Sequence, residues 1–181
     1  MQTRTTVVML GSFLALSSLT GCNREATKSP DVKSEVSRSL DQAGLKDVSV
    51  SQDRDKGVVT LSGHVASGDA KMQAENIAKS VAPGQVVANE IAVLPPGSEQ
   101  ITKDINSNLD DGIEKNLKAT LIASRLDSAI KYDVKNRVVT LKGDVDTQSR
   151  REQVAKLAAG VPNVDQVVNE LQVKDQKATS N

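Results

Sequence analysis

The chain has 181 residues, and its 23 Lys and Arg balance its 23 Asp and Glu, so the formal net charge is zero. A chain without surplus positive charge is not a typical nucleic-acid-binding protein. Phe13 and Tyr132 are its only Phe, Tyr or Trp residues, which argues against functions that stack bases on several aromatic side chains.

The first residues predict an export signal. Arg4 precedes an apolar run, Val7–Leu16, that is shorter than the roughly 20 residues needed to cross a bilayer. The sequence Leu19-Thr20-Gly21-Cys22 comes next and resembles the lipobox of bacterial lipoproteins. The resemblance implies cleavage before Cys22 and its acylation, with residues 1–21 as signal peptide and 22–30 as a polar tether. An ordinary signal followed by a free cysteine is the alternative.

Residues 31–94 predict a helix, two strands, a helix and a third strand. An apolar residue at every fourth position indicates the first helix, and alternation indicates the strands. A serine that suits an N-cap opens the second helix. In chain order these elements are the helix with Val32, Val36 and Leu40, the strands Val48–Ser51 and Val58–Val65 with a turn at Asp53–Gly57, the helix after Ser67, and the strand Val86–Val93.

The strand Val58–Val65 has two faces, because successive side chains point to opposite sides. Val59, Leu61, Gly63 and Val65 share the face expected to meet the helices. The opposite face contains Val58, Thr60, Ser62 and His64, and we expect it to be in water. The corresponding positions in the second half of the chain include Lys142 and Asp144.

A proline-rich linker separates this unit from the second half of the chain. Pro95-Pro96-Gly97 marks a turn. Ile101, Ile105 and Leu109 then suggest a helical segment within residues 95–110, which either packs between the two units or extends the next helix.

Residues 111–174 repeat the first unit. Val58-Val59-Thr60-Leu61 returns as Val138-Val139-Thr140-Leu141, and the same offset holds to the last strand, which indicates a duplicated structural unit. Asp111 is the expected N-cap of the first helix, and Thr147 that of the second. The predicted elements are the helix with Ile113, Leu117 and Leu121, a turn at Asp133–Arg137, the strand from Val138, the helix after Thr147 and the strand Val167–Val173, with a polar tail at 175–181.

These patterns resemble the BON module, the bacterial osmotic-stress and nodulation domain. The resemblance rests on the αββαβ order, the strands "VVTLSG" and "VVTLKG", and the closing strands of the form V-x-N-E. It implies an α+β fold with two tandem modules, each a small mixed three-stranded sheet covered on one face by two helices. Two such modules behind a lipobox look like the outer-membrane dual-BON lipoproteins.

Most chemically active side chains have a structural interpretation. His64 corresponds to Asp144 in the other copy and is expected on the surface. Paired carboxylates such as Asp110 and Asp111 suit turns and helix starts. Asn89 and Asn169 recur on a core-facing side and should be hydrogen-bonded framework. We therefore predict no catalytic residue, no metal site and no cofactor.

The lipid-binding candidates lie in the second module. Similar lipid-binding lipoproteins use the first helix of that module, and here Lys115 and Lys118 could meet phosphates while Ile122 inserts. Arg150 and Arg151 begin the last helix and form a second basic pair. Gly112, where an aromatic residue would help, departs from this pattern.

The sequence thus predicts a non-enzymatic protein of the cell envelope, anchored through acylated Cys22 and facing the periplasm from the outer membrane. Its modules would bind anionic phospholipid and support envelope integrity or osmotic-stress tolerance. The alternative is a scaffold or adaptor that binds envelope proteins through a sheet edge or a helix face. Nucleic acid is not an expected partner.

Overall fold

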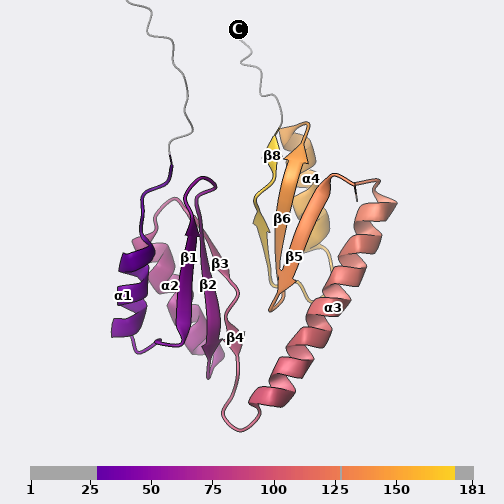
Figure 1. Cartoon of the computed structure of the whole chain (residues 1–181). Coiled ribbons are helices and arrows are strands. Elements are labelled where there is room, and N and C mark those ends of the chain that lie inside the picture. The colour runs from indigo at the N-terminus through magenta and orange to yellow at the C-terminus, as the bar shows by residue number, and fades with distance from the viewer. Residues whose placement is uncertain (1–27, 127, 174–181) are drawn as a thin grey trace, which may run out of the picture.

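The computed structural model describes residues 28–126 and 128–173 and contains two similar units (Figure 1). Signal peptide, Cys22 and polar tail fall outside these ranges. Module 1 contains α1 (Lys33–Gln42), β1 (Val48–Asp53), β2 (Val58–Val65), α2 (Gly68–Val81), β3 (Val86–Asn89) and β4 (Ala92–Val93). Module 2 contains α3 (Glu99–Ala123), β5 (Ile130–Lys135), β6 (Val138–Val145), α4 (Gln148–Ala159), β7 (Gln166–Asn169) and β8 (Gln172–Val173).

Each module has the predicted mixed sheet. In module 1, β1 pairs antiparallel with β2, and β2 pairs parallel with β3 and β4. Module 2 repeats this arrangement with β5, β6, β7 and β8. Figure 1 shows the helices of module 1 on one side of its sheet. The α+β fold with two αββαβ units is therefore confirmed.

Two separate aliphatic cores hold the modules together. Val36, Leu40, Val59 and Leu61 are fully buried in module 1, where both helices meet the sheet. Their counterparts in module 2 include Leu117, Leu121, Val139 and Leu141. Burial of a side chain of this size stabilises a fold by about 1.5–3 kcal/mol, so aliphatic residues supply most of both cores, and Tyr132 alone adds an aromatic ring at the edge of the second.

The expected N-caps of the second helices are confirmed. The Ser67 hydroxyl accepts a hydrogen bond from the Ala70 N–H at 3.2 Å. The Thr147 hydroxyl accepts one from the Arg150 N–H at 3.1 Å. Each cap satisfies one of the backbone donors that a helix start leaves unpaired.

The third strand of each module is interrupted by an asparagine. The Asn89 side-chain oxygen accepts a hydrogen bond from the Ile91 N–H, and Asn169 does the same for Leu171. Strand pairing is interrupted for the two residues that follow each asparagine, which separates β3 from β4 and β7 from β8. The single strand predicted over Val86–Val93 was therefore too long.

Helix α3 is longer than predicted, because the segment after the linker extends the helix of module 2. It runs without a break from Glu99 to Ala123. Asp111 lies inside it, so the prediction that Asp111 is an N-cap was wrong. The expected boundary at residue 110 likewise falls within the helix.

The turn between the first two strands is shorter in module 2 than in module 1. Asp53 pairs with Val58 across a turn of four residues, whereas Lys135 pairs with Val138 across Asn136 and Arg137 alone. The predicted turn Asp133–Arg137 was thus too long, since β5 continues to Lys135.

The outer face of β2 and β6 is only partly in water. His64 and Asp144 are exposed, as predicted. Val58 and Val138, however, are 4% and 2% exposed and pack with Ala88 and Val168 in a cluster between the modules. The prediction of an entirely wet face was wrong, because the alternation of one strand does not reveal that two modules meet there.

Gly63 lies against a strand backbone and not against a helix. A Cβ atom built on it would come 2.1 Å from the Asp47 carbonyl oxygen, and its φ is +106°. Gly143 has the same role beside Ala129. Both positions therefore require glycine, for its missing side chain and for its backbone freedom.

Candidate functional site

Three residues proposed for lipid contact lie together on the outside of α3. Lys115, Lys118 and Ile122 are exposed, and Ile122 is 51% accessible. At 100° per residue they lie within about 60° of one another around the helix axis. Residues Ile113 and Leu117 are buried on the other side. The helix thus presents two cations and an aliphatic side chain to solvent.

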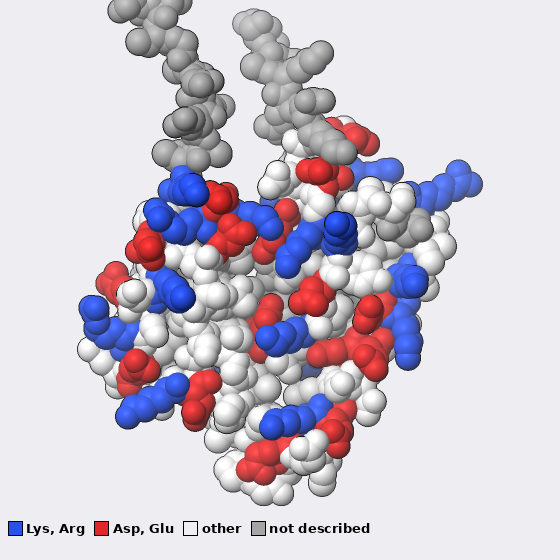
Figure 2. Space-filling view, viewed as in Figure 1, with Lys and Arg blue, Asp and Glu red and all other residues white. Residues whose placement is uncertain are grey.

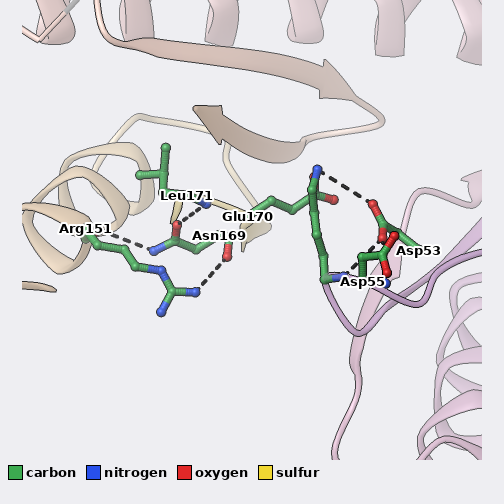
Figure 3. Close-up of polar contacts among 7 residues, drawn as sticks. Asp53, Asp55, Arg151, Asn169, Glu170 and Leu171 are labelled. Carbon is green, nitrogen blue, oxygen red and sulfur yellow. Dashed lines mark hydrogen bonds and ion pairs between the residues drawn. The ribbon is translucent and has the colours of Figure 1, made fainter. Parts of the chain in front are cut away.

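Arg150 and Arg151, the basic pair at the start of α4, have different surroundings. Arg150 is exposed. Arg151 is partly buried, and its guanidinium donates a hydrogen bond to the Asn169 carbonyl at 3.1 Å. The Asn169 amide in turn donates to the Arg151 carbonyl at 3.2 Å. Arg151 therefore joins α4 to β7 within its own module (Figure 3).

Asn89 has a comparable role in module 1. Its amide donates to the Lys71 carbonyl at 3.3 Å and to the Glu75 carboxylate at 2.9 Å. Burial opposes ionisation of Glu75, but hydrogen bonds from Asn89 and Lys79 outweigh it, so the pKa of Glu75 is lowered. The asparagines are framework residues, as predicted.

The two modules meet through the same positions in each copy. Val58 corresponds to Val138, and Ala88 corresponds to Val168; all four lie in one apolar cluster. Such an interface is isologous, since each partner offers the same patch to the other. It is small and aliphatic, so polar contacts at its edges contribute much of its specificity.

Two ion pairs flank this cluster. Lys56 Nζ lies 2.6 Å from Glu170 Oε2, and Lys135 Nζ lies 3.3 Å from Glu90 Oε2. The hydrogen bond to Glu170 is the main reason that the pKa of Lys56 is raised. Figure 3 shows Glu170 reaching from module 2 toward the turn of module 1 that carries Asp53. Each glutamate pairs with a lysine of the other module, Lys56 in the turn after β1 and Lys135 at the end of β5.

Gln166 adds a contact that breaks the symmetry. Its amide oxygen accepts from the Asn89 N–H at 3.0 Å, and its amide nitrogen donates to the Val87 carbonyl at 2.7 Å. The side chain thus binds the outer edge of β3 as a neighbouring strand would. The corresponding residue in module 1 is Val86, which is 48% exposed and cannot form these bonds.

A cleft of about 370 Å³ opens between the modules, and sequence reasoning did not single out the two cations that line it. Lys71 on α2 and Arg137 before β6 both line it. Burial lowers the pKa of Lys71. These residues are separated widely in sequence and follow no motif, so only the packing of the modules brings them together.

The described residues form no cluster that suits a metal ion. Within them, no group of three or more His, Cys, Asp and Glu side chains could hold a metal ion. The Asp53 carboxylate accepts from the N–H groups of Asp55 and Lys56, and the Asp110 carboxylate accepts from those of Asn136 and Arg137. Asp53 supports its own turn, as predicted, whereas Asp110 lies within α3 and supports the distant turn between β5 and β6.

The surface charge is mixed. Figure 2 shows Lys and Arg interspersed with Asp and Glu over the visible face. Among the helices in the described part of the chain, none combines the length and apolar character needed to cross a bilayer.

Comparison with known families decides what these modules are. The BON domain matches twice, over residues 29–95 and 109–175. The chain belongs to the BON family. The first matched segment spans the elements of module 1, and the second spans those of module 2 from Leu109 within α3 onward.

Two relatives of this BON protein are known by sequence. Osmotically-inducible protein Y of Escherichia coli strain K12 is 29% identical over 137 residues, which cover 75% of this chain and 67% of that protein. An uncharacterised protein encoded in the gshII 5′ region of Anaplasma centrale is 29% identical over 125 residues, covering 67% and 80% of the two chains.

Among solved structures, the C-terminal domain of CdsD, a structural protein of the type III secretion system of Chlamydia trachomatis, is similar at 12% identity. The match covers 80% of this chain and 66% of that chain, with a TM-score of 0.33. A second CdsD structure gives the same score over 61% of its length. A score this low supports no conclusion about fold or function.

Proposed function

We propose that this BON protein is a non-enzymatic, lipid-anchored protein of the cell envelope that binds anionic phospholipid through α3. The observation that carries the proposal is the exposed group of Lys115, Lys118 and Ile122 on one side of that helix. Cations near an anionic membrane surface contribute about 1 kcal/mol each. The inserted isoleucine adds the free energy of burying its aliphatic surface.

Arg150 supplements this surface, whereas Arg151 is already engaged within module 2. The acidic residues Asp104 and Asp111 lie on the same side of α3, toward its start. The proposed contact therefore involves the last turns of the helix and not its whole length. An acyl anchor at Cys22 would add the larger part of the membrane affinity, since several chains anchor stably where one does not.

A role in envelope integrity or osmotic-stress tolerance is part of this proposal. It is supported by the family and by the name of the Escherichia coli relative, which describes induction by osmotic conditions. Deletion of the gene should reduce growth in media of high osmolarity, and expression of the wild-type chain should restore it. Equal growth of the deletion strain would remove this part of the proposal.

Vesicle co-sedimentation tests the lipid contact directly. The full chain with Cys22→Ser, which cannot be acylated, should sediment with phosphatidylglycerol vesicles more than with phosphatidylcholine vesicles. The double variant Lys115→Ser/Lys118→Ser and the variant Ile122→Ser should each weaken sedimentation several-fold. Lys131→Ser/Lys142→Ser, which removes two exposed cations elsewhere on module 2, is the matched control. If both double variants lost vesicle binding equally, the proposal of a specific lipid-binding surface on α3 would be wrong.

The anchor is tested separately by fractionation of cells. The wild-type protein should remain with membranes after washing in high salt, and Cys22→Ser should appear in the soluble fraction or stay unprocessed. Normal membrane retention of the variant would argue against acylation.

A second candidate is an adaptor that binds another envelope protein. Ile101 and Ile105, on the first turns of α3, are 65% and 51% exposed, so this end of the helix carries aliphatic surface in water. Photo-crosslinkers at these two positions in cells should capture a protein if the adaptor function holds. Crosslinkers at Lys115 and Ile122 should instead capture lipid if the membrane contact holds.

A further inference from the structure

The cleft between the modules receives a cation from each of them. Lys71 reaches it from the second turn of α2, and Arg137 reaches it from the turn before β6. Lys71 lies close enough to Arg137 and Asp165 that their charges affect its pKa. The site therefore exists only in the two-module protein.

Lys71 is partly buried without a close counter-ion. In the described residues its amine is in no ion pair within 4.0 Å. Nearby carboxylates have other partners: Glu75 pairs with Lys79, and Asp165 lies 2.7 Å from Arg137. Partial removal of an ammonium from water costs free energy, and the charges of Asp165 and Glu75 offset it only in part, since the pKa of Lys71 stays lowered. An anion beside Lys71 would offset the remainder.

Arg137 occupies a backbone conformation that favours glycine. Its φ is +66°, in the left-handed region, where a long side chain is uncommon. The residue that precedes β2 in module 1 is Gly57, with a φ of +67°. The Asp110 carboxylate stabilises the turn by accepting from the Arg137 N–H at 2.8 Å. A two-residue hairpin turn of type I′ requires a positive φ at both of its positions, so glycine would be the unstrained choice here and arginine is an exception.

The floor of the cleft is apolar. Ala92 and Val93 on β4 line it, and Met72 on α2 is 59% exposed. A volume of about 370 Å³ corresponds to roughly a dozen water molecules at about 30 Å³ each. The space thus suits a small molecule with an aliphatic portion and not a folded partner.

We propose that this cleft binds a small organic carboxylate, whose charged group lies between Lys71 and Arg137 and whose aliphatic body contacts Met72 and Val93. The planar guanidinium group matches the geometry of a carboxylate. Asp69, Glu75 and Asp165 also line the cleft, and Asp165 already pairs with Arg137, so a singly charged ligand is favoured over a phosphate, which carries more negative charge. The ligand would bridge the modules and is independent of the membrane contact on α3.

Calorimetric titration of the full chain at low ionic strength tests the proposal, with hexanoate as the probe. Hexanoate should bind at least tenfold more tightly than acetate, which lacks the aliphatic body, or hexanol, which lacks the charge. It should also bind more tightly than hexyl phosphate. Lys71→Met should weaken hexanoate binding about tenfold, and Lys131→Met, at an exposed lysine on β5, should leave it unchanged.

Arg137→Gly separates binding from a structural role. It supplies the residue that module 1 has at this turn, so the unfolding midpoint should stay the same or rise while hexanoate binding falls at least tenfold. A destabilised Arg137→Gly variant that binds normally would overturn the proposal. So would equal binding of hexanoate and hexanol, tighter binding of hexyl phosphate, or equal losses in Lys71→Met and Lys131→Met.

Discussion

Lys56 Nζ of module 1 lies 2.6 Å from Glu170 Oε2 of module 2, although 114 residues separate them in the chain. The Glu170 side chain is only 9% exposed, whereas that of Lys56 is 29% exposed. A carboxylate so little exposed to water needs a partner. This contact therefore couples the modules. Lys56 and Glu170 should not contribute equally to the free energy of unfolding.

Removal of the lysine should be more damaging than removal of the negative charge. Lys56→Met leaves Glu170 charged without its cation and should lower the free energy of unfolding by about 2 kcal/mol. Glu170→Gln leaves an exposed lysine that water can solvate, and should cost about 1 kcal/mol. Urea denaturation measures both. Lys28→Met, at an ion pair that is exposed on both sides, is the control and should cost less than about 0.5 kcal/mol.

The same pair predicts a pH dependence. The pKa of Lys56 is raised in the folded protein, chiefly by the hydrogen bond to Glu170. Its stabilising contribution is therefore complete below the ordinary lysine pKa and is lost as pH rises through the higher folded value. The stability difference between wild type and Lys56→Met should be constant near neutral pH and shrink above about pH 10.5. A difference that grows with pH would contradict this assignment.

Asn89 and its counterpart Asn169 should differ in how much stability they contribute. Asn89 is 3% exposed and bonded to Lys71, Glu75 and Ile91. Asn89→Ala leaves the Ile91 N–H without its acceptor and should cost about 2–3 kcal/mol. Asn169→Ala, at a more exposed position, should cost about 1–2 kcal/mol. Thermal or urea unfolding measures which of the two variants loses more stability. Asn108→Ala, on the exposed side of α3, is the control and should leave the free energy of unfolding nearly unchanged.

Gly63 should tolerate no side chain. Gly63→Ala would place Cβ 2.1 Å from the Asp47 carbonyl oxygen at a φ of +106°, so strand β1 would have to move. We expect a loss of at least about 2 kcal/mol in the free energy of unfolding. Gly68→Ala is the matched control, because a Cβ there meets nothing within 4 Å. Comparable effects of the two variants would show that the strands adjust freely.

Sequence periodicity was sufficient to identify the core residues of a helix or strand that buries a single face. The stripe of Val36 and Leu40 and the alternation of Val59 and Leu61 identified the residues that form the core of module 1. The N-caps Ser67 and Thr147 were equally clear, since capping depends on a few adjacent residues. The predicted helix start at Asp111 was wrong, because a helix continues wherever its packing allows, even past a residue that could cap it.

No pattern in the sequence indicated the contacts between the modules. Val58 and Thr60 alternate with the core residues in the same way whether their face meets water or another module. Lys56 and Glu170, or Lys71 and Arg137, approach only after two folded units pack together. Their identities in the sequence do not indicate this, because a charged surface residue and a charged interface residue look alike.

The sequence by itself determined the duplicated αββαβ unit, its aliphatic cores and its likeness to the BON family, because these depend on local periodicity and on short repeated motifs. Only the tertiary structure decided that α3 is one continuous helix, that Glu170 and Glu90 pair across the modules, and that a cleft with Lys71 and Arg137 lies between them. These features depend on the relative placement of two similar surfaces, which is set by packing over long sequence separations.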